Sequence, residues 1–133
     1  MLGWVNLPRG KVEPITSSAR SVKGARVVFC ALDQTEEWVR SNGGLRLAET
    51  LRRNLAKTGG RSVETTNAYE PGVGTVAEGT HRAFDAGRQG IQFTWLRSSL
   101  KVEDPKDRGQ LRPALAEVYA GCPWVDVDRI VEE

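Results

Sequence analysis

Short apolar runs in this chain alternate with stretches of helical spacing, and this pattern predicts strands that alternate with helices. The clearest run, residues 27–32, is continuously apolar, rich in β-forming side chains and followed at once by Asp33. Such a run is typical of a strand buried on both faces of a parallel sheet. Residues 62–66 predict a second buried strand, residues 91–96 alternate as in a third, and residues 12–17 also suit a strand.

Helical spacing is clearest over residues 44–58, where apolar residues recur every three or four positions until Gly59 stops the helix. Thr75 and Glu78 have the spacing of a capping box, in which the threonine caps a helix start and the glutamate reaches back to the cap. This second helix should extend to about Ala86, since glycines follow it. Strands and helices in this order predict a layered α/β fold.

The C-terminal part of the chain predicts helices joined by polar loops. Residues 97–108 are charged and indicate a loop, and apolar spacing over residues 111–119 predicts a helix with Pro113 near its start. Asp126 is suited to cap a last short helix. The chain contains no internal repeat and no low-complexity tract.

Composition bounds the class of protein without assigning a function. A chain of 133 residues suits one domain with one core, and 39% hydrophobic with 27% charged residues excludes wholesale disorder. The net charge of +2 is too balanced to indicate a nucleic-acid binder by itself. Contact with DNA or a neighbouring subunit would need a local patch, and the helix at residues 44–58 offers one in Arg46, Arg52, Arg53 and Lys57, although a solvated helix face is the commoner explanation of such cations.

The few soft metal ligands indicate no zinc site. Cys30 lies in an apolar run, Cys122 lies in a turn, and His81 is the single histidine, expected to be exposed without a partner. The cysteines predict a reducing cytosolic setting without a structural disulfide. No apolar stretch is long enough to span a membrane, and residues 1–9 lack the features of a signal peptide.

The main chemical signal is the acidic end of the strand at residues 27–32. A carboxylate at the carboxyl end of a parallel strand, here Asp33, can hold hydrated Mg²⁺ beside nucleotide phosphates, as in a Walker B strand. Glu36 and Glu37 follow closely enough to orient or deprotonate an attacking water. Taken alone, an aspartate that merely favours the following turn is the commoner explanation.

A second group of polar residues ends the next predicted strand. Thr65, Thr66 and Asn67 carry hydroxyl and amide groups that could contact a phosphate or a water, or that could cap the following turn. In an open parallel sheet, ligands bind at the carboxyl ends of the strands. The two polar strand ends are therefore expected at the same edge of the sheet.

The order of these motifs resembles a known family. The resemblance covers roughly residues 12–133, is densest over residues 27–78, and rests on five segments in order: residues 28–38, 41–48, 52–57, 60–68 and 71–78. Together they resemble the ATPase domain of tailed-phage terminase large subunits, from the Walker B strand onward. The resemblance implies a part of the ATP-driven motor that packages double-stranded DNA.

The resemblance also implies a fold and a domain organisation. The fold expected is a partial three-layer α/β P-loop NTPase-like (ASCE) parallel sheet that lacks the phosphate-loop strand. Residues 1–96 would be the C-terminal part of the ATPase domain, and residues 97–133 the lid and linker leading towards a nuclease domain. The implied partners are double-stranded DNA, the portal protein and the small terminase subunit, with homo-oligomers at the portal, in the host cytoplasm and without a membrane.

By the resemblance, Asp33 binds Mg²⁺ through water, and Thr65, Thr66 and Asn67 form the coupling motif beside the nucleotide. The family pattern has a catalytic glutamate after the Walker B aspartate, where this chain has Gln34. An amide can orient a water but cannot accept its proton at neutral pH. Glu36 is the nearer substitute and Glu37 the next, and a purely structural glutamate pair at a helix start stays an alternative.

No phosphate-binding loop with the sequence Gly-x-x-x-x-Gly-Lys-Ser/Thr occurs in the chain. We therefore expect Mg²⁺ and ATP to bind only when a further N-terminal part supplies that loop, and the chain alone to be inactive. Loss of that strand would leave unpaired backbone edges and apolar faces on the sheet. Two alternatives stay open: a non-enzymatic module that binds DNA or a partner protein through the helix at residues 44–58, and an inactive prophage remnant.

Overall fold

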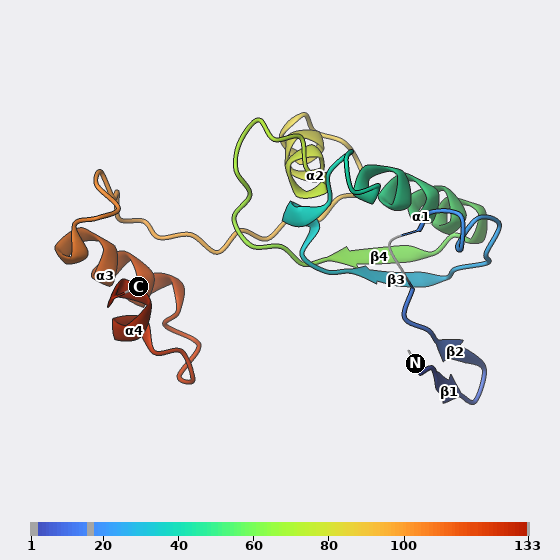
Figure 1. The fold of residues 1–133 in the computed structure, drawn as a ribbon, viewed down its shortest axis with the longest axis horizontal. Helices are drawn as coiled ribbons and strands as arrows, with labels where there is room; N and C mark the ends of the chain where they lie inside the picture. Colours follow the sequence, from blue (N-terminus) through green and yellow to red (C-terminus); the bar gives the residue numbers. More distant parts are fainter. Residues whose placement is uncertain (1–2, 16–17, 133) are drawn as a thin grey trace. The chain divides into compact units, whose positions relative to one another are not determined.

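The computed structural model describes residues 3–15 and 18–132, and the chain forms two compact units, Met1–Ile91 and Gln92–Glu133 (Figure 1). The fold is mixed α/β with two small two-stranded sheets. The division after Ile91 lies five residues before the border expected at residue 96, and the assignment of the two parts to an ATPase domain and a linker stays a prediction. Within the described residues, no helix combines the length and apolar character needed to cross a bilayer.

The first sheet is a hairpin of β1 (Val5–Leu7) and β2 (Gly10–Val12), which pair antiparallel with Leu7 opposite Gly10. All six residues of the two strands are exposed. The strand expected over residues 12–17 is therefore wrong for residues 13–15, since β2 ends at Val12; residues 16 and 17 lie outside the described part of the chain.

The second sheet positions the predicted site. It consists of β3 (Phe29–Leu32) and β4 (Arg61–Glu64), which pair in parallel from Phe29 opposite Arg61 to Leu32 opposite Glu64. Parallel neighbours need a crossover connection, and the helix α1 (Gly44–Thr58) supplies it. The short apolar runs at residues 27–32 and 62–66 thus become one βαβ unit, with strand bounds shifted by one or two residues.

The helix α1 lies along one face of this sheet and builds the core with it (Figure 1). The buried cluster takes one residue from β3, three from α1, one from the segment before β3 and one from the start of the helix after β4: Leu32, Leu47, Ala48, Leu51, Val22 and Val76. These apolar side chains lie on the side of α1 that the helical spacing of residues 44–58 predicts. Gly59 ends the helix with φ 67°, a conformation that favours glycine.

The opposite face of the β3–β4 sheet is open, so two expectations are wrong: that residues 27–32 form a strand buried on both faces, and that residues 62–66 form a buried strand. Phe29 is 60% exposed and Val63 is 46% exposed. Side chains alternate between the two faces of a strand, and among the described residues the packed core lies on the face that contacts α1. The two strands therefore contain more apolar side chains than the described residues bury.

The segment before β3 is fastened to α1 by one buried and one exposed polar contact. Asn54 is buried in α1, and its side-chain amide donates a hydrogen bond to the carbonyl of Val22 at 2.7 Å. The hydroxyl of Thr58 donates to the carbonyl of Val27. A buried amide is tolerated when it is hydrogen-bonded, so Asn54 fixes the approach of the chain to the sheet.

The helix α2 (Val76–Asp85) begins at the predicted capping box. The backbone N–H of Glu78 donates to the hydroxyl of Thr75 at 3.1 Å, and Ala86 caps the other end. The backbone N–H of Val76 donates to the carbonyl of Trp38 at 2.9 Å, which ties the helix start to the loop after β3. Both predicted bounds of this helix are confirmed to within a residue.

The strand expected over residues 91–96 is wrong. These residues form no strand in the described chain, and Trp95 and Leu96 are exposed. A strand needs a hydrogen-bonded neighbour, and alternation of side chains alone does not supply one. In the second unit, α3 (Arg108–Val118) packs against α4 (Val127–Glu132), and both helices lie where the sequence predicts them to within a few residues.

We predict that Leu51→Ala lowers the free energy of unfolding by about 2–5 kcal/mol, because the side chain is 2% exposed and its loss leaves a cavity between α1 and the sheet. Urea unfolding followed by circular dichroism measures the change. Val73→Ala is the control: Val73 is 50% exposed, so the expected change is within about 0.5 kcal/mol. Equal effects of the two substitutions would contradict the assignment of Leu51 to the core.

Candidate functional site

The carboxyl ends of β3 and β4 meet at one edge of the parallel sheet, and this edge brings Asp33 and Thr65 together. The backbone N–H of Thr65 donates to the carbonyl of Leu32 at 2.9 Å, and the N–H of Thr35 donates to the carbonyl of Thr65 at 3.3 Å. These bonds continue the pairing past the strands. The hydroxyl of Thr65 then donates to Oδ1 of Asp33.

The turn after Asp33 is held in uncommon geometry. Gln34 has φ 52° and ψ 50°, and among the described residues it is the one residue other than glycine that has a positive φ. Its backbone N–H donates to Oδ1 of Asp33 at 3.1 Å. The next residue, Thr35, is fully buried, and its hydroxyl has no hydrogen-bond partner among the described residues. The left-handed conformation of a non-glycine residue such as Gln34 costs on the order of 1–3 kcal/mol, and such conformations cluster at functional sites.

The short 3₁₀ helix η1 (Thr35–Glu37) carries Glu36 to the polar residues after β4. The hydroxyl of Thr66 donates to Oε2 of Glu36 at 2.8 Å, and the side-chain amide of Asn67 donates to Oε1 at 2.8 Å. Partial burial raises the pKa of Glu36, but the hydrogen bonds from Thr66, its own backbone and Asn67 outweigh it and hold the pKa below the ordinary value. Glu36 is therefore ionised at neutral pH.

Glu37 is exposed, and its carboxylate is not part of this hydrogen-bonded group. Its backbone carbonyl instead accepts a hydrogen bond from the side-chain amide of Asn42 at 2.7 Å. Asn42 also accepts from the backbone N–H of Val39 at 3.1 Å and of Gly44 at 3.0 Å, and so it fastens the loop that leads into α1. Sequence reasoning did not single out Asn42, although asparagine before glycine is a common turn signal.

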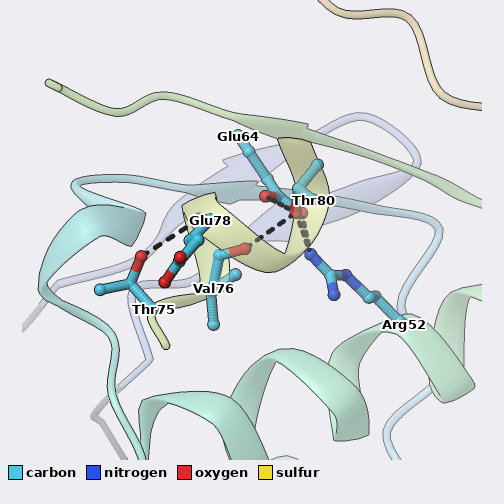
Figure 2. A network of polar contacts seen from close by, with 6 residues as sticks. All are labelled: Arg52, Glu64, Thr75, Val76, Glu78 and Thr80. Atoms are coloured by element: carbon cyan, nitrogen blue, oxygen red, sulfur yellow. Dashed lines mark hydrogen bonds and ion pairs between the residues drawn. The ribbon is translucent and has the colours of Figure 1, made fainter. Parts of the chain in front are cut away.

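A charged network joins the end of β4 to both helices of the unit, as Figure 2 shows. Glu64, the last residue of β4, forms an ion pair with Arg52 of α1. The hydroxyl of Thr80 in α2 lies 2.8 Å from Oε2 of Glu64 and accepts a hydrogen bond from Arg52 at 2.8 Å. Arg52 therefore links α1 to the end of β4 and to α2, and so helps to hold the elements that carry the site.

The loop after Asn67 is anchored on a buried carboxylate. Glu78 of α2 accepts hydrogen bonds from the backbone N–H groups of Gly72 and Gly74, each at 2.7 Å, and pairs with Arg82 at 2.6 Å. The hydrogen bonds from Gly72 and Gly74 lower the pKa of Glu78 more than burial raises it. The capping box predicts that Glu78 belongs to the start of α2, but it does not predict that the Glu78 side chain also holds the loop before this helix.

His81 is half-buried and partnered, so the expectation of an exposed histidine without a partner is wrong. Its Nδ1 forms a hydrogen bond with the hydroxyl of Tyr69, and the two rings meet edge-on with centroids 5.8 Å apart. Its Nε2 lies 3.6 Å from Oδ2 of Asp85. The contact with Tyr69 adds a second link between the loop at residues 68–74 and α2.

Two open hollows between residues 18–26 and α1 are lined by basic side chains. One, of about 400 Å³, includes Arg26 and Lys57, and the other, of about 330 Å³, includes Arg20 and Arg46. Arg46 and Lys57 are eleven residues apart in α1, which places them on the same side of the helix. Of the four basic residues predicted on this helix, Arg52 pairs with Glu64 and Arg53 with Glu49, while Arg46 and Lys57 form no ion pair with the described residues.

Among the described residues, the side chains that could bind a metal do not gather into a metal centre. No group of three or more histidine, cysteine, aspartate or glutamate residues lies together among the residues described. Cys30 and Cys122 are free thiols, and burial followed by the charge of Glu64 raises the pKa of Cys30. The carboxylate of Asp33 is exposed, and the hydrogen bonds to it from the described residues all reach Oδ1.

Comparison with known proteins places the chain among phage proteins. It is 28% identical over 148 aligned positions to the Gene 13 protein of Mycobacterium phage L5, covering 92% of this chain and 25% of that protein. It is 36% identical over 75 positions to the Gene 13 protein of Mycobacterium phage D29, covering 52% of this chain and 13% of that protein. The chain thus spans about a quarter or less of the length of these relatives. No protein-family model and no solved structure matches it.

We predict that Glu78→Gln flattens the acid dependence of stability. The folded-state pKa of Glu78 lies below its ordinary value of 4.5, so its ionised form stabilises the fold above pH 4.5, and this contribution is lost as the pH falls through the lowered pKa. Thermal unfolding at a series of pH values should show a Tm that falls on acidification more steeply in the original chain than in Glu78→Gln.

The matched control for this prediction is Glu49→Gln, because Glu49 is an exposed residue of α1 that pairs only with the exposed Arg53 in the described contacts. Glu49→Gln should keep the acid dependence of the original chain. Parallel Tm curves for Glu78→Gln and the original chain would show that Glu78 does not couple folding to proton binding.

Proposed function

We propose that this chain is the Walker B and coupling portion of the ATPase domain in a DNA-packaging terminase large subunit. The observation that carries the proposal is the hydrogen-bonded meeting of Asp33 and Thr65 at the carboxyl ends of adjacent parallel strands. A parallel sheet binds ligands at this edge. The similarity to phage proteins, of which the chain spans about a quarter or less, supports a role as part of a larger phage protein.

The proposal accounts for the open face and edge of the β3–β4 sheet. In a three-layer P-loop NTPase-like fold, the phosphate-loop strand would pair beside β4, and a second layer would cover Phe29 and Val63. Neither side chain is buried by the described residues, and an exposed apolar face of this kind is typical of a surface that another segment covers. Residues 97–133 would then be the lid and linker that follow the ATPase domain.

The residues at the strand ends fit the chemistry of Mg²⁺ and ATP. Mg²⁺ is bound by few carboxylates together with water and phosphate oxygens, and the exposed carboxylate of Asp33 suits an indirect contact through water. When bound, Mg²⁺ neutralises charge on the phosphates. Thr65 holds the Asp33 carboxylate in place, while the phosphate-binding loop must come from outside the sequence of these residues.

Of the two candidate bases, the geometry favours Glu36. Its carboxylate lies within hydrogen-bond distance of Thr66 and Asn67, whereas Glu37 is exposed and its carboxylate stays outside this hydrogen-bonded group. Gln34 can orient a water through its amide but cannot take its proton. Double-stranded DNA, the portal protein, the small terminase subunit, assembly into homo-oligomers and a place in the host cytoplasm all follow from the motor assignment.

We predict that Asp33→Asn lowers Mg²⁺-dependent ATP hydrolysis about 10–100-fold, the effect typical of losing a partner that acts on a metal through its bound water. Hydrolysis is measured after the chain is combined with the polypeptide that supplies the phosphate-binding loop. Asp85→Asn is the control, because Asp85 is an exposed aspartate of α2 that contacts His81. Equal hydrolysis by the original chain and Asp33→Asn would refute the Walker B assignment.

A second candidate function, a DNA-binding module, is favoured by the two basic hollows along α1. Each is lined in part by two cations from different segments, Arg26 with Lys57 and Arg20 with Arg46. Lysine and arginine that contact DNA phosphates release counterions, so binding through these hollows would weaken steeply with salt. This function needs neither the phosphate-binding loop nor Glu36.

We predict that Lys57→Gln reduces the salt dependence of binding to double-stranded DNA. The slope of log affinity against log salt should become shallower by about 0.9, because the variant neutralises one DNA phosphate fewer. Fluorescence anisotropy of labelled DNA at several salt concentrations gives the slope. Lys101→Gln is the matched control, since Lys101 is highly exposed and lies outside both hollows. An unchanged slope in Lys57→Gln, or the absence of DNA binding, would refute this candidate.

A further inference from the structure

We propose that Thr66 and Asn67 are positioning residues that hold Glu36, and that Glu36 supplies the carboxylate which the chain lacks at Gln34. The inference deepens the proposed function and rests on it. By resemblance, Thr66 and Asn67 would contact the nucleotide. The structure instead directs both side chains to Glu36, which lies 30 and 31 residues away along the chain.

The contact between these residues is a clamp with two points. Thr66 donates to Oε2 and Asn67 to Oε1 of the same carboxylate, each at 2.8 Å. One donor on each oxygen fixes the rotation of the carboxylate plane, which a single hydrogen bond would not do. Backbone hydrogen bonds from Glu36 itself and from Asn67 also reach this carboxylate, so it is held by backbone as well as side-chain donors.

The same hydrogen bonds set the charge of Glu36. They hold its pKa below the ordinary value against the effect of partial burial, so Glu36 is ionised. Because a lowered pKa weakens a base, the clamp contributes by positioning the carboxylate and not by activating it. In the proposed reaction, Glu36 takes a proton from water while the water oxygen bonds to the terminal phosphorus. The bond from that phosphorus to the ADP oxygen breaks, ADP leaves with the electron pair, and Glu36 later returns the proton to solvent.

Thr66 can also release this clamp. Its hydroxyl lies 2.9 Å from the carbonyl of Asn67 as well as 2.8 Å from Oε2 of Glu36. A hydroxyl has one hydrogen to donate, so Thr66 bonds one of these acceptors at a time. A small shift of residues 65–67 would move the hydrogen from Glu36 to the backbone and thereby alter the basicity of Glu36. This is a direct physical link between the coupling motif and the base.

The neighbouring residue Thr65 strengthens the assignment because it contacts a different carboxylate. Thr65 bonds to Asp33, and the two residues after it bond to Glu36, so residues 65–67 contact two carboxylates of the β3 side in order. The next fixed point of the loop is Glu78, which holds Gly72 and Gly74. A displacement of residues 65–67 would therefore change the surroundings of Asp33 and Glu36 together.

The first test measures the clamp in the 133-residue chain without nucleotide. With ¹³C-labelled glutamate, NMR titration should show that Thr66→Val and Asn67→Ala raise the pKa of Glu36 towards its ordinary value, while Thr66→Ser restores the lowered pKa because it keeps the hydroxyl. Glu36→Gln assigns the signal. Thr80→Val is the matched control, since its hydroxyl contacts Glu64 and its removal should leave Glu36 unchanged. An unchanged pKa in both clamp variants would overturn the proposal.

The second test measures Mg²⁺-dependent ATP hydrolysis after the phosphate-loop polypeptide is added. Glu36→Gln should lower kcat by about 10²–10⁴-fold, the usual contribution of a general base, and Glu37→Gln should retain hydrolysis. Thr66→Val should lower kcat, and Thr66→Ser should restore it. If Asp33→Asn lowers hydrolysis but Glu36→Gln does not, the motor proposal stands and this inference fails. If hydrolysis is absent throughout, the proposed function fails whatever the NMR titration shows.

Discussion

The parallel pairing of β3 with β4 is the constraint on which the rest of this structure depends. Its register sets Leu32 opposite Glu64, and the backbone bond from Thr65 to Leu32 carries the pairing one step further. Asp33 and Thr65 meet because both strands run in the same direction and end at the same level. A slip of one residue would turn each side chain to the other face and separate the two polar strand ends.

Carboxylates hold the polar loop after β4 in place from two sides. Glu36 accepts hydrogen bonds from the side chains of Thr66 and Asn67, and Glu78 accepts hydrogen bonds from two backbone N–H groups further along the loop. Glu64 braces the strand itself through its contacts with α1 and α2 (Figure 2). Each carboxylate meets several donors, which is the condition for keeping charged groups in a partly buried place. The loop is thus positioned by charge-assisted hydrogen bonds more than by apolar packing.

Much of the first unit could be predicted from local patterns. The helix at residues 44–58, its stop at Gly59 and the capping box at Thr75 follow from spacing and from side-chain preferences that act over a few residues. The strand at residues 91–96 could not be judged in this way, because alternation describes the faces of a strand but not the presence of a neighbour. The open face of β3 shows the same limit, since apolar residues reveal a tendency to be buried and not what covers them.

For the candidate site, the sequence by itself determined which chemical groups end each strand and that Asp33 and residues 65–67 belong at one edge. Only the tertiary structure decided that Glu36, and not Glu37, reaches Thr66 and Asn67. That choice depends on the path of the chain after Asp33, where η1 starts directly after the left-handed residue Gln34. Contacts across 30 residues arise from register and turn geometry together, and no pattern of neighbouring residues encodes both.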